Sequence, residues 1–327
     1  MLSRVADSIY WMSRYIERAE NVARFIDVNL HLTLETPLAQ GQWQPLINTT
    51  GDHEVFSKRH VLANRENVIH FLTFDLEYAN SILSCFRSAR ENARSIREAV
   101  SSEMWEQVNR SYLMVQAAAK TLHSFKAQQD FYAAVKDASH LFNGIAEATL
   151  YRNEAWNFLI LGRMLERADK TSRILDVKYF LLLRSAADVG TPFDDIQWAA
   201  VLRSASAFEM YRKRIGRISP EGIVEFLLLD AEFPRAIRYC LNRARECLHD
   251  ISGTPLNTFR NPAERSLGQL CSELAYAQVK EVLRAGLHEY LDDLQTKVNQ
   301  VGQAIFDTFF ALRLPSSVRQ SMLQRSQ

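Results

Sequence analysis

Two stretches far apart in the chain carry nearly the same set of charged residues. Residues 14–28 read RYIERAENVARFIDV, and residues 163–177 read RMLERADKTSRILDV. Arginine binds carboxylates and phosphates through two parallel N–H donors, and glutamate can orient such an arginine or transfer a proton. These residue types therefore point to an anion-binding site or an acid–base site. Aligned at a shift of 149 positions, the stretches share the identical pairs Arg14/Arg163, Glu17/Glu166, Arg18/Arg167, Ala19/Ala168, Arg24/Arg173, Asp27/Asp176 and Val28/Val177.

In a helix these charges would lie along one edge of each segment. Arg14, Glu17, Asn21 and Arg24 follow one another at steps of three or four residues. A solvated face with pairs worth ~0.3 kcal/mol each is the ordinary interpretation of such spacing. The recurrence of Arg-x-x-Glu-Arg in both stretches argues against it, because solvated charges can be exchanged at little cost.

Three uses of these charges remain open. The arginines could form a clamp for a phosphate or carboxylate, or Glu17 and Glu166 could act as catalytic general acids or bases after burial shifts their pKa. Alternatively, Glu and Arg from the two stretches could face each other as an interhelical ion-pair lock that fixes helix register. Further candidates come from the SARENARSIRE segment at 88–98 and its later equivalent. The candidate anion- or substrate-binding residues are Arg14, Glu17, Arg18, Arg24, Arg90, Glu91, Arg94, Arg163, Glu166, Arg167, Arg173 and Arg245.

No cofactor or metal is indicated. The sequence has no glycine-rich phosphate loop and no G-x-S-x-G motif. A di-metal helical bundle requires Glu-x-x-His on two helices, whereas the motif occurs once, at Glu246 and His249. The four cysteines have no C-x-x-C spacing, so we expect reduced, buried thiols and no zinc site.

Composition gives no overall attraction to polyanions. Lys and Arg number 39 against 38 for Asp and Glu, so the formal net charge of +1 points to neither nucleic acid nor an anionic membrane as a partner. The N-terminal residues lack an uninterrupted apolar run, and no stretch reaches the ~18 apolar residues of a spanning helix. We therefore expect a cytoplasmic protein without a membrane segment.

The elements that carry these charges should be helices. Glycine (11) and proline (8) are sparse, and a stripe of apolar residues from Val5 to Leu30 recurs at steps of three and four. Breaks are expected at residues 35–52, 188–195, 217–222 and 251–262, and residues 315–327 should form a frayed tail. Asp75 and Asp230 should stand at helix starts.

A second repeat extends the first. Residues 66–91 match residues 221–246 at a shift of 155, with the identical pairs Asp75/Asp230, Glu77/Glu232, Cys85/Cys240, Arg90/Arg245 and Glu91/Glu246. We interpret the chain as an internal duplication with halves at about 1–150 and 151–314. The expected fold is an all-α helical bundle in which two duplicated halves share one core and are related by pseudo-two-fold symmetry.

The same segments resemble a known family. MLSRVADSIYWMSRYIERAENVARFIDVN, SARENARSIREAVSSEMWEQVN, GRMLERADKTSRILDVKY and FPRAIRYC are similar to the bacterial alpha-E domain, an all-helical domain named for its Glu-Arg motif. The likeness covers essentially all of residues 1–327 as a single domain. One departure is LEYANSI after Asp75, which lacks the family's Asn-Pro turn at Asn80.

The resemblance implies a setting rather than a reaction. Similar proteins are typically encoded beside, or fused to, a circularly permuted ATP-grasp ligase, often with a transglutaminase-like protein. This implies a role in ATP-dependent synthesis or attachment of a peptide or peptide-like tag, with Glu17-Arg18 and Glu166-Arg167 as the residues that meet an anionic group. We favour a non-catalytic module that binds the ligase or its peptide substrate, and the catalytic and lock interpretations stay open.

Overall fold

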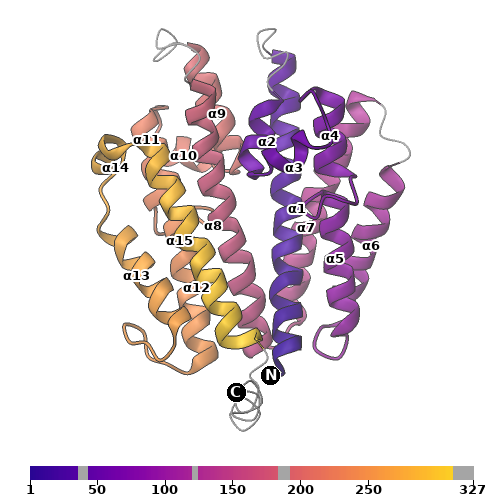
Figure 1. Ribbon diagram of the computed structural model, residues 1–327, viewed down its shortest axis with the longest axis vertical. Helices are drawn as coiled ribbons and strands as arrows, with labels where there is room; N and C mark the ends of the chain where they lie inside the picture. Colours follow the sequence, from indigo (N-terminus) through magenta and orange to yellow (C-terminus); the bar gives the residue numbers. More distant parts are fainter. Residues whose placement is uncertain (36–42, 120–123, 183–191, 312–327) are drawn as a thin grey trace, which may run out of the picture.

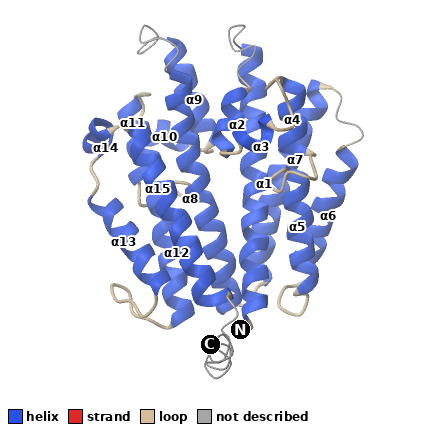
Figure 2. Ribbon diagram, viewed as in Figure 1, coloured by secondary structure: helices blue, strands red, loops and turns tan. Residues whose placement is uncertain are grey.

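The computed structural model describes residues 1–35, 43–119, 124–182 and 192–311, and most of these residues lie in helices. Figure 2 shows helices joined by loops and turns, without a strand among the described residues, which confirms the all-α fold class. The helices are α1 (Ser3–Glu35), α2 (Gln44–Thr50), α3 (His53–Ser57), α4 (Arg65–Thr73), α5 (Ile82–Ser95), α6 (Ser102–Ala118), α7 (Phe125–Thr149), α8 (Glu154–Leu182), α9 (Pro192–Ser204), α10 (Phe208–Arg214), α11 (Pro220–Val224), α12 (Ile237–Ser252), α13 (Pro262–Tyr276), α14 (Val279–Ala285) and α15 (Leu287–Ile305), with π-helical turns η3 (Glu225–Leu229) and η4 (Phe306–Phe310).

Helices α1 and α8 form the centre of the bundle and run in the same direction (Figure 1). Their first residues lie close together, because the N-terminal ammonium of Met1 donates to Glu154 Oε2 at 2.6 Å. Further along, Gly162 of α8 lies directly against the backbone of Tyr10 in α1, and a Cβ at this position would overlap the Tyr10 carbonyl oxygen. A glycine at this position therefore lets the two helices approach closely.

The remaining helices surround this pair in two groups (Figure 1). Helices α5 and α7 pack against α1, whereas α12 and α15 pack against α8. The apolar stripe predicted in α1 is confirmed, since Ile9, Met12, Ala19, Ala23 and Ile26 are fully buried. Because neighbours cover α1 on several sides, much of its polar edge is buried as well.

Helix boundaries follow local signals. Ser81, Ser101 and Ser124 precede α5, α6 and α7, and each side chain accepts the backbone N–H three residues later, as N-cap serines do. The predicted break at 251–262 is confirmed between α12 and α13. The break predicted at 35–52 is wrong in part, because residues 44–50 form α2, which begins with Pro45 in its first turn.

Asp75 and Asp230 do not start helices, contrary to the sequence-based expectation. Asp75 Oδ1 accepts the N–H of Glu77 at 2.9 Å, and Asp230 Oδ1 accepts the N–H of Glu232 at 2.7 Å. Helices α5 and α12 begin only seven residues later, at Ile82 and Ile237. The two aspartates stabilise equivalent turns, because a short carboxylate can bond the backbone two residues ahead.

The remaining predictions concern membrane-spanning helices, metal sites, the cysteines and the C-terminal tail. No helix in the described part of the chain is long and apolar enough to cross a membrane. The same residues contain no cluster of His, Cys, Asp and Glu that could hold a metal ion. Cys85, Cys240, Cys247 and Cys271 are free and buried, as predicted. The predicted tail at 315–327 lies outside the described residues.

Candidate functional site

The two Glu-Arg motifs bind each other across the α1–α8 interface. Arg18 donates from Nε and Nη2 to the two carboxylate oxygens of Glu166, at 2.7 and 2.9 Å. Arg167 donates in the same way to Glu17, also at 2.7 and 2.9 Å. Both pairs are bidentate, the geometry in which arginine and carboxylate interact most strongly. Each motif thus supplies the acid to one bridge and the base to the other.

Burial excludes a solvated face for these residues. The side chains of Glu17 and Glu166 are 1% and 0% exposed, and those of Arg18 and Arg167 are 13% and 12% exposed. An ionised carboxylate without partners would be very costly in such a position. The buried glutamates are therefore paired with arginines across the interface between α1 and α8, as an interhelical ion-pair network.

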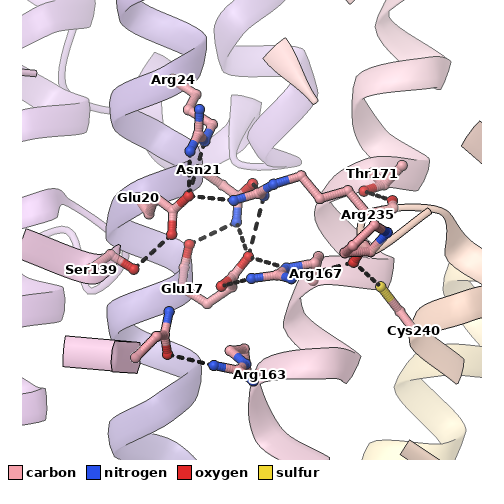
Figure 3. A network of polar contacts seen from close by, with 12 residues as sticks. Glu17, Glu20, Asn21, Arg24, Ser139, Arg163, Arg167, Thr171, Arg235 and Cys240 are labelled. Atoms are coloured by element: carbon pink, nitrogen blue, oxygen red, sulfur yellow. Dashed lines mark hydrogen bonds and ion pairs between the residues drawn. The ribbon is translucent and has the colours of Figure 1, made fainter. Parts of the chain in front are cut away.

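The Glu17 cluster is the first of two charge clusters built on this interface (Figure 3). Glu20 lies one turn beyond Glu17, is fully buried and accepts hydrogen bonds from Arg24 at 2.6 Å and from Ser139 of α7 at 2.6 Å. Arg235, which precedes α12, donates to Glu20 and to Asn21, the latter at 3.2 Å. The cluster thus ties α1 to α7, α8 and the start of α12.

The Glu166 cluster is the second. Arg14 donates from Nε to Glu166 Oε2 at 2.9 Å, alongside Arg18. Lys170 lies 3.6 Å from Glu166 and donates to Asp169 at 2.9 Å, and Arg173 also donates to Asp169, at 3.1 Å. Asn80 before α5 accepts a hydrogen bond from Arg18 Nη1. We refer to the Glu17 cluster and the Glu166 cluster together as the Glu/Arg network.

Cations outnumber carboxylates in the Glu/Arg network. The Glu17 cluster has two carboxylates and three arginines, and the Glu166 cluster has two carboxylates, three arginines and one lysine. The formal surplus is three positive charges, two of them in the Glu166 cluster. The members are Glu17, Glu20, Arg24, Arg167 and Arg235 in the first cluster, and Arg14, Arg18, Glu166, Asp169, Lys170 and Arg173 in the second.

The surplus affects the pKa of every carboxylate in the network. Burial alone would raise the pKa of Glu166, but the charges of Arg18, Lys170 and Arg14 outweigh it and hold the pKa well below its usual range. The pKa of Glu20 is likewise well below its usual range, that of Glu17 is lowered, and that of Asp169 falls to about 2. All four carboxylates are therefore ionised at neutral pH.

The pKa values of two arginines are lowered as well, which for a base disfavours the charged form. Burial, together with the neighbouring charge of Arg167, lowers the pKa of Arg163 and of Arg235. Arg163 donates to Asn143 at 2.7 Å and forms no ion pair among the described residues, and its buried Nε has no partner there. Positive charge is thus less than fully compensated near the centre of the bundle.

Not every predicted site residue lies in this network. Arg90 donates to Asn109 of α6, while Glu91 pairs with Arg90 and with Arg94, whose side chain is 66% exposed. Arg245 lines a separate cleft between α12 and α13. The structure brings Arg14, Glu17, Arg18, Arg24, Glu166, Arg167 and Arg173 together, places Arg163 beside them, and leaves Arg90, Glu91, Arg94 and Arg245 elsewhere.

The predicted site residues did not include four members of the network, Glu20, Asp169, Lys170 and Arg235, or Asn80, which contacts Arg18. A signal for two of them existed in the repeats. At a shift of 155 Asn80 aligns with Arg235, and at a shift of 149 Asn21 aligns with Lys170. The positions of Asn21 and Arg235 in one set, and of Lys170 and Asn80 in the other, therefore each carry one cation and one amide. The cation stands at the later position in the first set and at the helix α8 position in the second.

The geometry favours binding over proton transfer. Every carboxylate in the network is already paired with cations and has a lowered pKa, whereas a general acid needs a pKa near the working pH. The cations, in contrast, outnumber the carboxylates that the described residues supply to the network. Such an arrangement can hold an additional anionic group.

Comparisons with known proteins agree with the sequence motifs. The model of the Alpha-E family, described as a predicted alpha-helical domain with a conserved ER motif, matches residues 1–310. Uncharacterized proteins of Mycobacterium bovis and Mycobacterium tuberculosis are each 23% identical over 337 aligned residues, which cover 94% of this chain. The chain spans 37% of the length of these relatives. No solved structure matches the chain.

Proposed function

This chain belongs to the Alpha-E family, and from its Glu/Arg network we propose that it is a non-catalytic binding module of a peptide-ligase system. The observation that carries the proposal is the surplus of three positive charges in the Glu/Arg network, which is centred on two helices held together by reciprocal ion pairs. The reciprocal pairs act as a lock that fixes the helix pair, and the surplus cations are the anion clamp. Lock and clamp thus coexist in one network.

The proposed ligand group is a carboxylate or an acyl phosphate. Arginine recognises both, because its planar donors match two oxygens of either anion. A peptide ligase that uses ATP handles both groups, as substrate and as intermediate. The charge of the Glu/Arg network therefore suits a role beside such an enzyme.

The proposed partner is a circularly permuted ATP-grasp ligase, with a transglutaminase-like protein as a possible further component. The resemblance described above motivates this choice. In the mycobacterial relatives the region similar to this chain is 37% of a longer polypeptide, which is consistent with a module that works next to other domains. The ligand would then be a peptide or peptide-like molecule shared with that ligase.

We further propose that the chain arose by internal duplication. The reciprocal pairs Arg18–Glu166 and Arg167–Glu17 join equivalent positions of the two repeats. Helices α5 and α12 pack against α1 and α8 in matching positions, and the turns at Asp75 and Asp230 have the same hydrogen bond. A pseudo-two-fold axis parallel to α1 and α8 accounts for all three observations.

Association of the purified chain with the ligase of the same organism tests the proposed function. We expect binding at micromolar concentration in sedimentation experiments, weakened by Arg173→Gln, which lowers the surplus while Lys170 still pairs with Asp169. Arg152→Gln is the matched control, because this α8-proximal arginine is half-exposed and outside the network. Absence of association, and of peptide binding, at these concentrations would refute the proposal.

A further inference from the structure

A cavity of about 260 Å³ opens beside the Glu166 cluster, between α1 and the α15–η4 segment. One wall is Tyr10, Trp11 and Arg14 of α1, and the facing wall includes Asn299 and Phe306. On the α15–η4 side, positions 299, 302, 303 and 306 follow the helical i, i+3, i+4, i+7 spacing, so one face of this segment lines the cavity.

Among the described residues, Arg14 is the only charged side chain that lines this cavity. Its Nε donates to Glu166 and its Nη1 donates to the Tyr10 hydroxyl at 2.9 Å, whereas Nη2 has no hydrogen-bond partner among the described residues. The guanidinium carbon lies 4.8 Å from the Trp11 ring centroid and 5.5 Å from that of Tyr10. The two rings and Glu166 thus fix the guanidinium with a donor unused.

Charge near Arg14 is not balanced by Glu166. That carboxylate is shared between Arg14, Arg18 and Lys170, so the cavity borders the part of the network with the larger positive surplus. An anion that enters the cavity would meet a desolvated, oriented arginine. A carboxylate has the size and acceptor geometry to use it.

The other walls select for an apolar group. Tyr10, Trp11, Phe306 and Phe310 supply aromatic surface, and Leu165 and Val298 supply aliphatic surface. Phe306 is 45% exposed at the rim, so its ring is accessible to a molecule that enters the cavity. It also begins the π-helical turn η4, a distortion that frequently occurs at functional sites.

We propose that this cavity binds a carboxylate attached to an aromatic or branched apolar group, the chemistry of a peptide C-terminal residue or of an N-acylated amino acid. The carboxylate pairs with Arg14, the apolar group lies among the four aromatic rings, and the Asn299 and Gln303 amides meet the peptide bond. This inference rests on the proposed anion-binding role of the network and names its ligand class and position.

Calorimetric titration of the purified chain tests the assignment with four probes: N-acetyl-phenylalanine, its amide, N-acetyl-leucine and the peptide Gly-Gly-Phe. We expect both acetylated acids to bind and the amide to bind at least about tenfold more weakly, since it lacks the charge. Arg14→Gln should weaken acid binding by a similar factor and leave amide binding unchanged. We expect Arg14→Gln to fold, because Glu166 keeps Arg18 and Lys170 as partners, and circular dichroism checks this.

A second variant fills the cavity without replacing a residue of the network. A Cβ at Gly302 would meet Arg14 Nη1 only at van der Waals distance, 3.8 Å, so Gly302→Leu adds its remaining atoms to the cavity and should abolish binding. Gly144→Leu is the matched control, because this helical glycine of α7 has open space around it. Binding should be unchanged in that control.

The outcomes separate this inference from the proposed function. Absence of saturable acid binding at millimolar concentration, equal binding of acid and amide, or full binding by Gly302→Leu would overturn the cavity assignment. Ligase association measured separately would then leave the proposed function standing. Tighter binding of Gly-Gly-Phe than of the acetylated amino acid identifies a peptide terminus as the ligand, and the reverse order identifies the free acylated amino acid.

Discussion

Glu166→Gln is the substitution that tests the Glu/Arg network most directly. Glu166 is 0% exposed and accepts three arginine hydrogen bonds, two from Arg18 and one from Arg14. Glutamine keeps the shape, but it removes the charge and turns one acceptor oxygen into an N–H₂ group that faces an arginine donor. Removing one partner of a buried ion pair lowers the free energy of unfolding by about 3–5 kcal/mol. Here Arg14 and Arg18 lose the only ionic partner that each has among the described residues, so we expect a value in that range.

Urea unfolding followed by circular dichroism measures this change. Glu154→Gln is the matched control, since this glutamate begins the same helix, is 47% exposed and loses only an exposed ion pair with the Met1 ammonium, so stability should change by less than about 1 kcal/mol. Adding Arg18→Gln to Glu166→Gln should cost less than the sum of the single changes, because it removes the stranded charge. A loss for Glu166→Gln no larger than that of the control would refute the reasoning.

Three further predictions follow from the same contacts. The pKa values of Glu17, Glu20, Glu166 and Asp169 are lowered in the folded state, so the unfolded chain binds protons more tightly. The free energy of unfolding should therefore be constant near neutral pH and fall from about pH 4.5 toward pH 2, with a shallower fall in Glu166→Gln. A flat profile from pH 5 to 3 would contradict the network. Gly162→Ala should lower the free energy of unfolding by about 3 kcal/mol through the clash with the Tyr10 carbonyl, while Gly144→Ala should raise it by up to about 1 kcal/mol, both measured by urea unfolding. Arg235→Asn should lower the free energy of unfolding, and adding Asn21→Lys should restore part of the loss, because the two positions then carry the residue types of Asn80 and Lys170, with which they align. An additive double variant would count against this equivalence.

The periodicity of α1 predicted its core residues but not the environment of its polar edge. Ile9, Met12 and Ile26 are buried as the stripe requires. A single-helix pattern distinguishes apolar from polar, however, and not solvent from a second polar helix. Glu17 therefore fitted a solvated face, a clamp and an interhelical lock equally well until α8 was placed beside it.

The contribution of Arg235 lay beyond any local pattern. This residue is more than 200 positions from Glu17 and Asn21 and reaches them from a loop before α12. Helical spacing reports neighbours three or four residues away, so it is silent about such contacts. Alignment of the two sequence repeats could have indicated Arg235 as a candidate. Asn21 aligns with a lysine, Lys170, and Asn80 aligns with Arg235, so a cation lost at one position is matched by a cation gained at the other.

The reciprocal arrangement of the two bidentate bridges has a mechanical consequence. Helices α1 and α8 run in parallel, and each contributes the acid to one bridge and the base to the other. If α8 moved along its axis relative to α1, Glu166 and Arg167 would move in the same direction past Arg18 and Glu17, so a slide in either direction strains both bridges. Translation of the two helices is thereby opposed in both senses. Piston motion of one helix past the other is therefore disfavoured, whereas rotation of the helix pair as one body leaves both bridges intact.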